Sequence, residues 1–280
     1  MKKLLSLLFV GLLVAFLAAC GSDDKKSNEN ADKEDLVEIV VGASNVPHAE
    51  ILEKAAPLLE ERGIKLVIET YQDYVLPNDD LENGTLDANY FQHIPYLEEQ
   101  IRTIGYDFVN LGGIHIEPMG IYSKNITDVN EIPEGTEVII SRSVADHGRI
   151  LSLLETHGLL KLDESVDKIT ATVDDIVENP LNLKFDSSVD PGFLPEFYER
   201  EEDAIIAINT NYAIEAGLNP AEDALILEGG ESPYVNIIAA RSEDKDNENL
   251  KTLVEVLRSE EIQNFILEKY EGSIVPVSGE

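Results

Sequence analysis

The 280-residue sequence has one cysteine, Cys20, no tryptophan, and aromatic residues at only 6% of its positions. A lone cysteine excludes an intrachain disulfide, so we expect the folded part to depend on its hydrophobic core. Several functional signatures are also missing: the Gly-rich P-loop of nucleotide hydrolases, the Gly-x-Ser-x-Gly elbow, the His-Glu-x-x-His zinc motif and a calcium loop. The five histidines lack the spacing of a metal site. These absences argue against an enzyme and against a bound cofactor or metal.

Basic residues are scarce as well. The chain has 21 Lys and Arg against 55 Asp and Glu, which gives a formal net charge of −34. Such a charge repels the phosphates of nucleic acids and of anionic lipids, so neither is expected as a partner of the folded part. The acidic residues are spread along the chain instead of forming a tail, and we interpret them as a solvated surface.

The only long apolar run lies at the N-terminus. It covers residues 4–19 after a basic start, which is short for a membrane span and typical of a signal peptide, predicted here at residues 1–19. The run ends in the letters LAAC before Gly21, which resembles the lipobox of bacterial lipoproteins. The resemblance implies a diacylglyceryl group on Cys20 and lipid anchoring to the cell membrane, facing the extracytoplasmic side. Residues 20–35 then form a polar, flexible tether.

From about residue 36 the chain alternates β-branched apolar runs with amphipathic segments, the pattern of a parallel α/β sheet. We expect strands at 37–42, 65–70, 87–91, 108–111, 121–123, 137–141, 168–172, 181–185, 204–208, 225–227 and 235–241. Helices are expected at about 47–62, just before Gly84, and at 96–104, 146–157, 194–199, 248–258 and 262–270. This length suits two α/β lobes, with 36–120 and 233–280 in lobe 1 and 121–232 in lobe 2. Two chain crossovers and a ligand cleft between the lobes follow from that division.

The densest aromatic segment is 87–96, with the sequence DANYFQHIPY. On an extended backbone Phe91 and His93 project to the same side, and Tyr96 follows the turn expected at Pro95. Such residues build one wall of a small, mostly apolar pocket, and they serve equally well as ordinary core. The residue types alone leave both interpretations open.

The most informative polar segment is 141–149, which follows an expected strand and leads into a helix. Arg149 offers a planar fork that suits a carboxylate, and Asp146 can receive an ammonium group. A surface ion pair between them is the plainer alternative. Asn209 follows the strand at 204–208 and Asn236 lies in the strand at 235–241, where an amide either reaches a cleft or caps a turn.

Seven segments resemble, in order and with similar spacing, the MetQ/NlpA family of lipoprotein substrate-binding components of methionine importers. They are VPHAE (46–50), DYVLPN (73–78), DANYFQHIPY (87–96), GR (148–149), VENP (177–180), INTNYA (208–213) and SPYVN (232–236). The resemblance extends over residues 37–270 and implies a type II periplasmic-binding-protein fold whose lobes close on an amino acid. It also implies two partners, an ABC permease and its ATPase, which fits the missing P-loop.

Position by position, the resemblance assigns the thioether side chain of the ligand to four residues: Tyr74, Phe91, His93 and Tyr96. Aromatic rings make favourable contacts with a polarisable sulfur. By the same resemblance Arg149 would bind the α-carboxylate, and Asn209 and Asn236 would hold the rest of the polar end.

Two departures from the family pattern concern that polar end. Where the family usually reads Pro-Asn-Asp-Pro-Thr-Asn before Gly-Arg, this chain reads SRSVAD, so Asp146 replaces an amide and Arg142 adds a cation. The segment 186–194, DSSVDPGFL, also differs from the usual family sequence. We expect both regions to face the cleft. L-Methionine is the expected ligand, with another amino acid, a methionyl dipeptide, or a metal ion bound through Asp146 and His147 as the alternatives.

Overall fold

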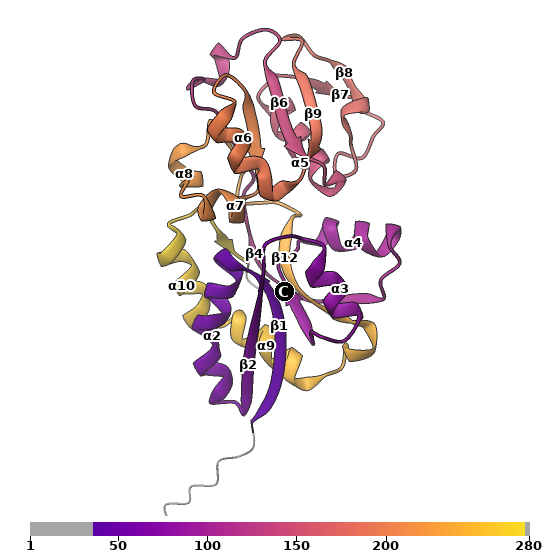
Figure 1. The fold of residues 1–280 in the computed structure, drawn as a ribbon, viewed down its shortest axis with the longest axis vertical. Coiled ribbons are helices and arrows are strands. Elements are labelled where there is room, and N and C mark those ends of the chain that lie inside the picture. Colours follow the sequence, from indigo (N-terminus) through magenta and orange to yellow (C-terminus); the bar gives the residue numbers. More distant parts are fainter. Residues whose placement is uncertain (1–35, 278–280) are drawn as a thin grey trace, which may run out of the picture. The chain divides into compact units, whose positions relative to one another are not determined.

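The structure, a computed structural model, describes residues 36–277. The predicted signal peptide, Cys20 and the predicted tether all lie outside the described residues. Within 36–277 no helix combines the length and the hydropathy needed to cross a membrane. The described chain forms two main β-sheets with helices packed on them (Figure 1), which confirms the α/β class.

The first sheet has six strands in the order β13-β4-β12-β3-β1-β2. Their bounds are β1 Val37–Ser44, β2 Ile64–Tyr71, β3 Ala88–Tyr90, β4 Phe108–Ile116, β12 Val235–Arg241 and β13 Val275–Pro276. β1 runs parallel to β2 and β3, whereas β12 is antiparallel to β3 and β4, and β13 is antiparallel to β4. The sheet is therefore mixed, not parallel as predicted, because the returning C-terminal strands pair in the opposite direction.

The second sheet has five strands in the order β11-β5-β10-β6-β9. Their bounds are β5 Gly120–Tyr122, β6 Glu137–Ser141, β9 Lys184–Val189, β10 Ile205–Ile208 and β11 Ile226–Leu227. β6 pairs in parallel with β9 and β10, and β5 is antiparallel to β10 and β11. A separate two-stranded sheet joins β7 (Lys161–Leu162) to β8 (Ile176–Glu178).

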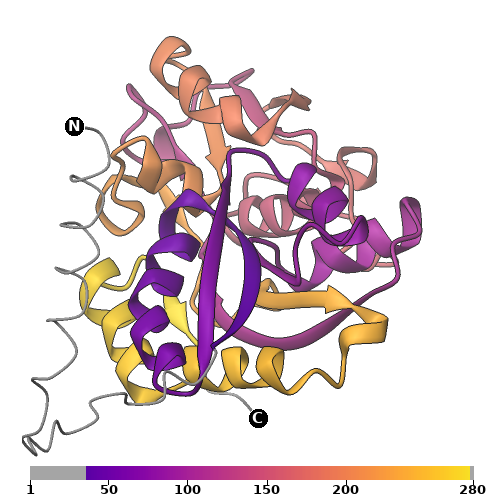
Figure 2. The ribbon, with the colours of Figure 1, turned by 60° about the horizontal axis from the view of Figure 1, so that its bottom comes forward.

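Helices cover both faces of the six-stranded sheet. α2 (Glu50–Glu60), α9 (Glu248–Leu257) and α10 (Glu260–Tyr270) pack on one face, where Figure 2 shows the yellow C-terminal helices beside α2, and α3 (Leu76–Glu82) and α4 (Ile94–Thr103) pack on the other. The sequence of β12 sets this arrangement, because successive strand side chains point to opposite faces. Ile238 and Ala240 join the core under α2 and α9, whereas Ile237 and Ala239 join the core under α3 and α4.

The five-stranded sheet follows the same rule. α5 (Val144–Thr156) packs on one face, and α6 (Leu194–Arg200) and α7 (Thr210–Glu215), followed by α8 (Pro220–Asp223), pack on the other side. Ile205 and Ala207 of β10 contact the α5 side, and Ile206 and Ile208 contact the α6 side. Burying an isoleucine fully is worth about 1.5–3 kcal/mol, so this two-sided burial fixes the register of β10.

The chain passes between the two sheets twice. Residues 117–119 connect β4 to β5, and residues 228–234 connect β11 to β12. The strands of the first sheet come from 37–116 and 235–276, and those of the second come from 120–227. We keep the division into lobe 1 (36–120 and 233–280) and lobe 2 (121–232) as a proposal that this sheet composition supports.

The segment 168–172 was expected to be a strand, and this prediction is wrong. The Asp167 side chain accepts a hydrogen bond from the Ile169 N–H, and the Asp167 carbonyl accepts one from the Thr170 N–H, so the chain turns here. The strand expected at 181–185 overlaps only the start of β9, which begins at Lys184. Pro95 ends the extended segment as expected, but it lies in the first turn of α4 instead of before the helix, where its missing N–H costs nothing.

At Gly148, helix α5 passes very close to the turn formed by residues 168–170. A Cβ atom at Gly148 would overlap the backbone carbonyl oxygens of Lys168 and Ile169, which cannot move as a side-chain tip can. We expect Gly148→Ala to lower the free energy of unfolding by about 1–3 kcal/mol, measured by urea denaturation. Gly229→Ala is the matched control, since no atom lies within 4 Å of its added Cβ. A Gly148→Ala variant as stable as the control would contradict this packing.

Candidate functional site

A pocket lies where side chains from segments of both sheets meet. It has about 390 Å³ of space not filled by protein atoms, counting the part open to solvent. All eight residues predicted to bind a ligand line it: Tyr74, Phe91, His93, Tyr96, Asp146, Arg149, Asn209 and Asn236. The structure therefore brings the predicted residues together, and their roles toward a ligand stay predictions.

Aromatic rings form one end of the pocket. The Phe91 and Tyr96 rings are 6.1 Å apart between centroids, and the half-buried Tyr74 ring lies 5.9 Å from Phe91. Hydrogen bonds fix the two tyrosines: the Tyr96 hydroxyl donates to the Tyr74 carbonyl at 2.9 Å, and the Tyr74 hydroxyl donates to Asn211 Oδ1 at 2.6 Å. The rings thus pack on one another as a small apolar cluster with Ala145 and also face the pocket.

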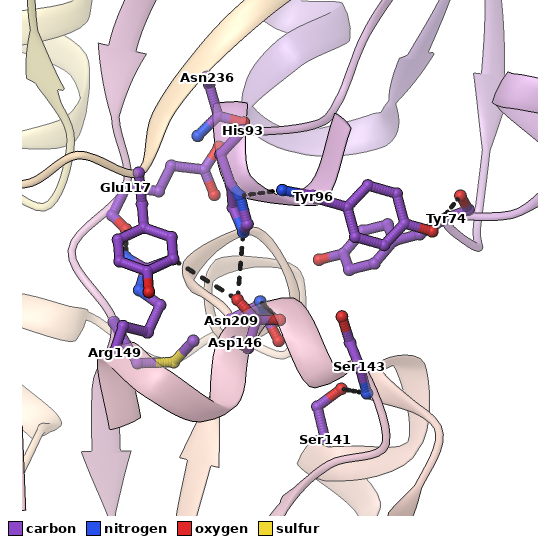
Figure 3. Close-up of polar contacts among 12 residues, drawn as sticks. Tyr74, His93, Tyr96, Glu117, Ser141, Ser143, Asp146, Arg149, Asn209 and Asn236 are labelled. Atoms are coloured by element: carbon purple, nitrogen blue, oxygen red, sulfur yellow. Dashed lines mark hydrogen bonds and ion pairs between the residues drawn. The ribbon is translucent and has the colours of Figure 1, made fainter. Parts of the chain in front are cut away.

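His93 joins the aromatic end to the polar end. It is the N-cap of α4, where its Nδ1 accepts a hydrogen bond from the Tyr96 backbone N–H at 3.1 Å. That ring nitrogen therefore carries no proton, and the proton is on Nε2, which lies 3.1 Å from Asp146 Oδ1. Figure 3 shows this His93–Asp146 pair with Glu117 and Arg149 on one side and Tyr74 and Tyr96 on the other. A helix cap thus sets the tautomer that faces the pocket.

Asp146 and Arg149 lie in the first two turns of α5, and both are buried, which excludes the surface ion pair. Burial alone would raise the pKa of Asp146, but hydrogen bonds from His93 and Asn209 and the charge of Arg149 hold that pKa below its usual range. Asn209 Nδ2 donates to Asp146 Oδ2 at 3.1 Å, and Arg149 Nη1 lies 3.8 Å from Asp146 Oδ1. Asp146 is therefore an ionised carboxylate within the pocket.

Arg149 is held firmly by other contacts. Its Nη2 donates to the Glu117 carbonyl at 2.9 Å and to the Glu228 carboxylate, and its guanidinium lies 4.3 Å from the centroid of the Tyr234 ring. Its Nε is buried without a hydrogen-bond partner in the described part of the chain. The guanidinium is thus fixed in position and keeps donor capacity for an acceptor in the pocket.

Glu117, which the sequence analysis did not single out, also lines the pocket. Its Oε1 lies 2.9 Å from His115 Nε2 and 3.2 Å from His48 Nε2, and its Oε2 accepts from the Asn211 N–H at 3.1 Å. Burial opposes ionisation, yet these two histidines and Arg149 keep the pKa of Glu117 below its usual value. The sequence held one signal for Glu117, because it is an acidic residue between the apolar strand β4 and Pro118. Gln92 and Thr210 are further lining residues that were missed, and Asn211, two residues past Asn209, also lines the pocket.

His48, His115 and Glu117 also form the kind of cluster that can hold a metal, with ligand atoms all within 4.8 Å of one another. Hydrogen bonds already account for this geometry. Tyr90 Oη and His115 Nδ1 are 2.5 Å apart, and His48 Nε2 lies 3.1 Å from Asn236 Oδ1. A metal on His48 Nε2 would move that ring's proton to Nδ1, which is buried and has no partner in the described chain. The cluster thus fits a hydrogen-bonded network better than a metal site.

Two residues and one segment that were predicted near the ligand lie elsewhere. His147 Nε2 contacts the Ser141 carbonyl at 2.8 Å, so it does not join Asp146 as a metal ligand. Arg142 pairs with the partly exposed Asp190 at 2.6 Å and does not line the pocket. Asp190 and Phe193 of the 186–194 segment line a separate hollow beside Tyr212. Of the two altered regions, only Asp146 reaches the pocket.

The buried network predicts a pH dependence of stability. Burial outweighs the attraction of Glu117 and lowers the pKa of His48 from 6.5 to about 4. Between these values the unfolded chain binds a proton that the folded chain does not. The free energy of unfolding therefore falls as the pH is lowered from 6.5 toward 4, by up to about 3 kcal/mol for this group.

We expect His48→Gln, which keeps an N–H donor, to lose less stability than the wild type between pH 6.5 and 4.5 in urea denaturation. His157→Gln serves as the control because His157 is exposed. Equal acid-dependent losses in the wild type and His48→Gln would contradict a buried neutral His48.

Comparison with known proteins shows which sequences and structures this chain is similar to. The family model for NlpA lipoprotein matches residues 39–278. The methionine-binding lipoprotein MetQ of Bacillus subtilis (strain 168) is 44% identical over 284 residues, covering 99% of this chain and 100% of that protein.

Two solved structures are similar throughout the folded part. A pheromone cOB1 precursor/lipoprotein of the YaeC family from Enterococcus faecalis V583 has 53% identity and a TM-score of 0.83, covering 86% of this chain and 100% of that one. A nutrient binding protein from Burkholderia cenocepacia bound to methionine has 38% identity and a TM-score of 0.80, and the match covers 85% of this chain and 99% of that one. The predicted periplasmic-binding-protein fold is confirmed by this likeness, and the chain belongs to the NlpA lipoprotein family.

Proposed function

We propose that this protein is a lipid-anchored, extracytoplasmic receptor that captures L-methionine, or a close relative of it, and delivers it to an ABC importer. One observation carries the proposal: a single buried pocket has three aromatic rings at one end and ionised or amide groups at the other. That division matches an amino acid whose side chain is apolar and polarisable. The similar MetQ protein of B. subtilis, by its name, and the methionine-bound protein of B. cenocepacia support methionine as the ligand.

The aromatic end would take the side chain. The rings of Phe91 and Tyr96 are tilted by 76° to each other, so a sulfur that lies against both would meet the edge of one ring and the face of the other. Each good sulfur–aromatic contact is worth about 0.3–1.5 kcal/mol. Tyr74 and His93 would close this end, and the hydrogen bonds that hold their side chains keep the rings in place before ligand arrives.

The polar end would take the α-carbon substituents. Arg149 offers its unpartnered Nε and its Nη1 to the carboxylate, and Asp146 offers an acceptor to the ammonium. Asn209 and Asn236 add amide groups at the same end.

Capture without chemical conversion fits the pocket. Its carboxylates are held ionised by hydrogen-bond donors, and no pocket residue is a nucleophile activated by an adjacent base. We therefore propose a binding protein and no enzyme. A permease and a separate ATPase would drive uptake, because the chain has no P-loop, and lipidated Cys20 would hold the receptor at the membrane.

A different ligand within the same fold is the second candidate. Asp146 favours it, because a carboxylate at this position suits a ligand richer in N–H groups than a free amino acid, such as a methionyl dipeptide. Another amino acid would be a further case.

Phe91 provides the test of the methionine assignment. Norleucine replaces the methionine sulfur by a methylene group and keeps the rest of the molecule. We expect the ligand-stripped wild type to bind L-methionine about two- to tenfold more tightly than norleucine in calorimetric titration, because only sulfur gains from the rings. Phe91→Leu keeps an apolar side chain without a ring, and it should weaken methionine binding and narrow this preference.

Phe193→Leu is the control, since Phe193 is 59% exposed and lies outside the pocket. If the wild type binds no methionine, the proposed function is wrong. If Phe91→Leu keeps the full preference for methionine over norleucine, the aromatic end does not hold the thioether.

A further inference from the structure

The ligand pocket contains a cation and a carboxylate that are placed to neutralise each other. Asp146 and Arg149 are three residues apart on α5, and such residues lie on the same face of a helix. The Asp146 side chain is 2% exposed and the Arg149 side chain 4%, and both residues line the pocket. Arg149 Nη1 nevertheless stays 3.8 Å from Asp146 Oδ1, about 1 Å beyond the length of a charge-assisted hydrogen bond. Another contact must therefore hold the guanidinium back.

Glu228 supplies that contact from outside the pocket. Its carboxylate accepts a hydrogen bond from Arg149 Nη2, and Glu228 does not line the ligand pocket. Of the residues that the structure describes, only Asp146 and Glu228 place a carboxylate oxygen within 4 Å of the Arg149 guanidinium. The two carboxylates thus compete for one cation, and Glu228 makes the closer contact.

The Glu228 carboxylate is itself fixed by two further donors. Its Oε2 accepts a hydrogen bond from the Met119 N–H at 2.9 Å, and its Oε1 accepts one from the Ser232 hydroxyl at 2.9 Å. The Glu228 N–H donates to the Met119 carbonyl at 2.9 Å, which extends the pairing of β5 with β11. Met119 and Glu228 belong to the two segments that connect the sheets, so Glu228 ties these segments to each other and to α5. None of these contacts needs a ligand, so the fold alone sets the position of Glu228.

Arg149 keeps its other donors for the pocket as a result. Its Nη2 is occupied by Glu228 and by the Glu117 carbonyl, whereas its Nε and Nη1 form no hydrogen bond within the described chain. A direct pair between Arg149 and Asp146 would use Nη1 and the Asp146 carboxylate together. A ligand that carries both an anion and a cation would then have to break a buried ion pair before it could bind.

We propose that Glu228 is a positioning residue that keeps Arg149 from pairing with Asp146, so that both charges stay available to a zwitterionic ligand. This inference rests on the proposed function, since it concerns an amino acid in the pocket. A carboxylate at position 146 attracts Arg149 in a way that an amide would not, and the chain offsets this attraction with a second carboxylate outside the pocket. Without the Glu228 charge, Arg149 Nη1 would close on Asp146.

Removing the Glu228 charge tests the inference. Glu228→Gln keeps the size of the side chain, and we expect it to weaken L-methionine binding by at least about tenfold in calorimetric titration of the ligand-stripped protein, because a charge-assisted hydrogen bond to the ligand is lost to Asp146. Glu231→Gln is the matched control, since it removes one charge from an exposed carboxylate of the same connecting segment and should bind like the wild type. A Glu228→Gln variant that binds methionine as tightly as this control overturns the inference.

Asp146→Asn separates positioning from a general structural role, because it removes the group on which Arg149 would close. In that background we expect Glu228→Gln to leave methionine affinity unchanged or to improve it, although Asp146→Asn alone lowers the affinity. An equal fold-loss of affinity in both backgrounds would show that Glu228 merely supports the fold, and it would overturn the inference.

Urea denaturation of the ligand-stripped variants tests the same competition without a ligand. A new pair between Arg149 and Asp146 would offset part of the lost Glu228 contact, so Glu228→Gln should lower stability less in the wild type than in Asp146→Asn. Equal losses of stability would overturn the inference. If the wild type binds no methionine, the proposed function is wrong, and this comparison still decides whether the two carboxylates compete. If Glu228→Gln does not fold, Ser232→Ala, which removes a donor to Glu228, should give smaller effects of the same sign.

Discussion

The pocket depends on two buried carboxylates, Asp146 and Glu117. Both lose their hydration on burial, so the protein must supply hydrogen-bond donors in its place. An ionised group in a protein interior needs donors close by, since the cost of leaving it unpaired is several kcal/mol. Asp146 obtains its donors from the β3–α4 junction and from the start of α7, through His93 and Asn209. Glu117 obtains its donors from the segment that follows β1, from the end of β4 and from α7. Segments from both sheets must therefore meet at these two groups.

The same donors shape the aromatic end. The cap that His93 Nδ1 makes on α4 favours the tautomer that donates to Asp146, and the same cap holds the Tyr96 backbone N–H one turn along. Asn211 places its backbone N–H on Glu117 and its side-chain oxygen on the Tyr74 hydroxyl. The apolar and polar ends of the pocket are thus parts of one hydrogen-bonded network, which explains how a small number of rings keeps a defined shape in a chain with few aromatic residues.

Local patterns in the sequence predicted most helices and most strands. They also singled out seven of the eight proposed contact residues, because those residues follow strand ends or cluster in short segments, whereas Tyr74 and the roles of all eight came from the family resemblance. Strand direction was not predictable in the same way: β12 pairs with β3 and β4 across more than a hundred residues of chain, and no local pattern encodes that return. Glu117 was missed for the same reason, since one of its donors is 94 residues away and is a backbone N–H that any residue could provide. The false strand at 168–172 shows the opposite error, where an alternating pattern was overridden by the side chain of Asp167.

The most direct measurement is the thermal unfolding of the mature chain, stripped of carried ligand by unfolding and refolding, against a panel of amino acids. A ligand at about a thousand times its dissociation constant adds roughly 4 kcal/mol to stability. For a chain of this size, at about 2–4 °C per kcal/mol, the midpoint should rise by on the order of 10 °C. We predict such a rise with L-methionine and a much smaller one with charged or short-chain amino acids. No rise with methionine, alongside a large rise with one of those others, would contradict the account of a pocket that pairs a thioether end with an ammonium end.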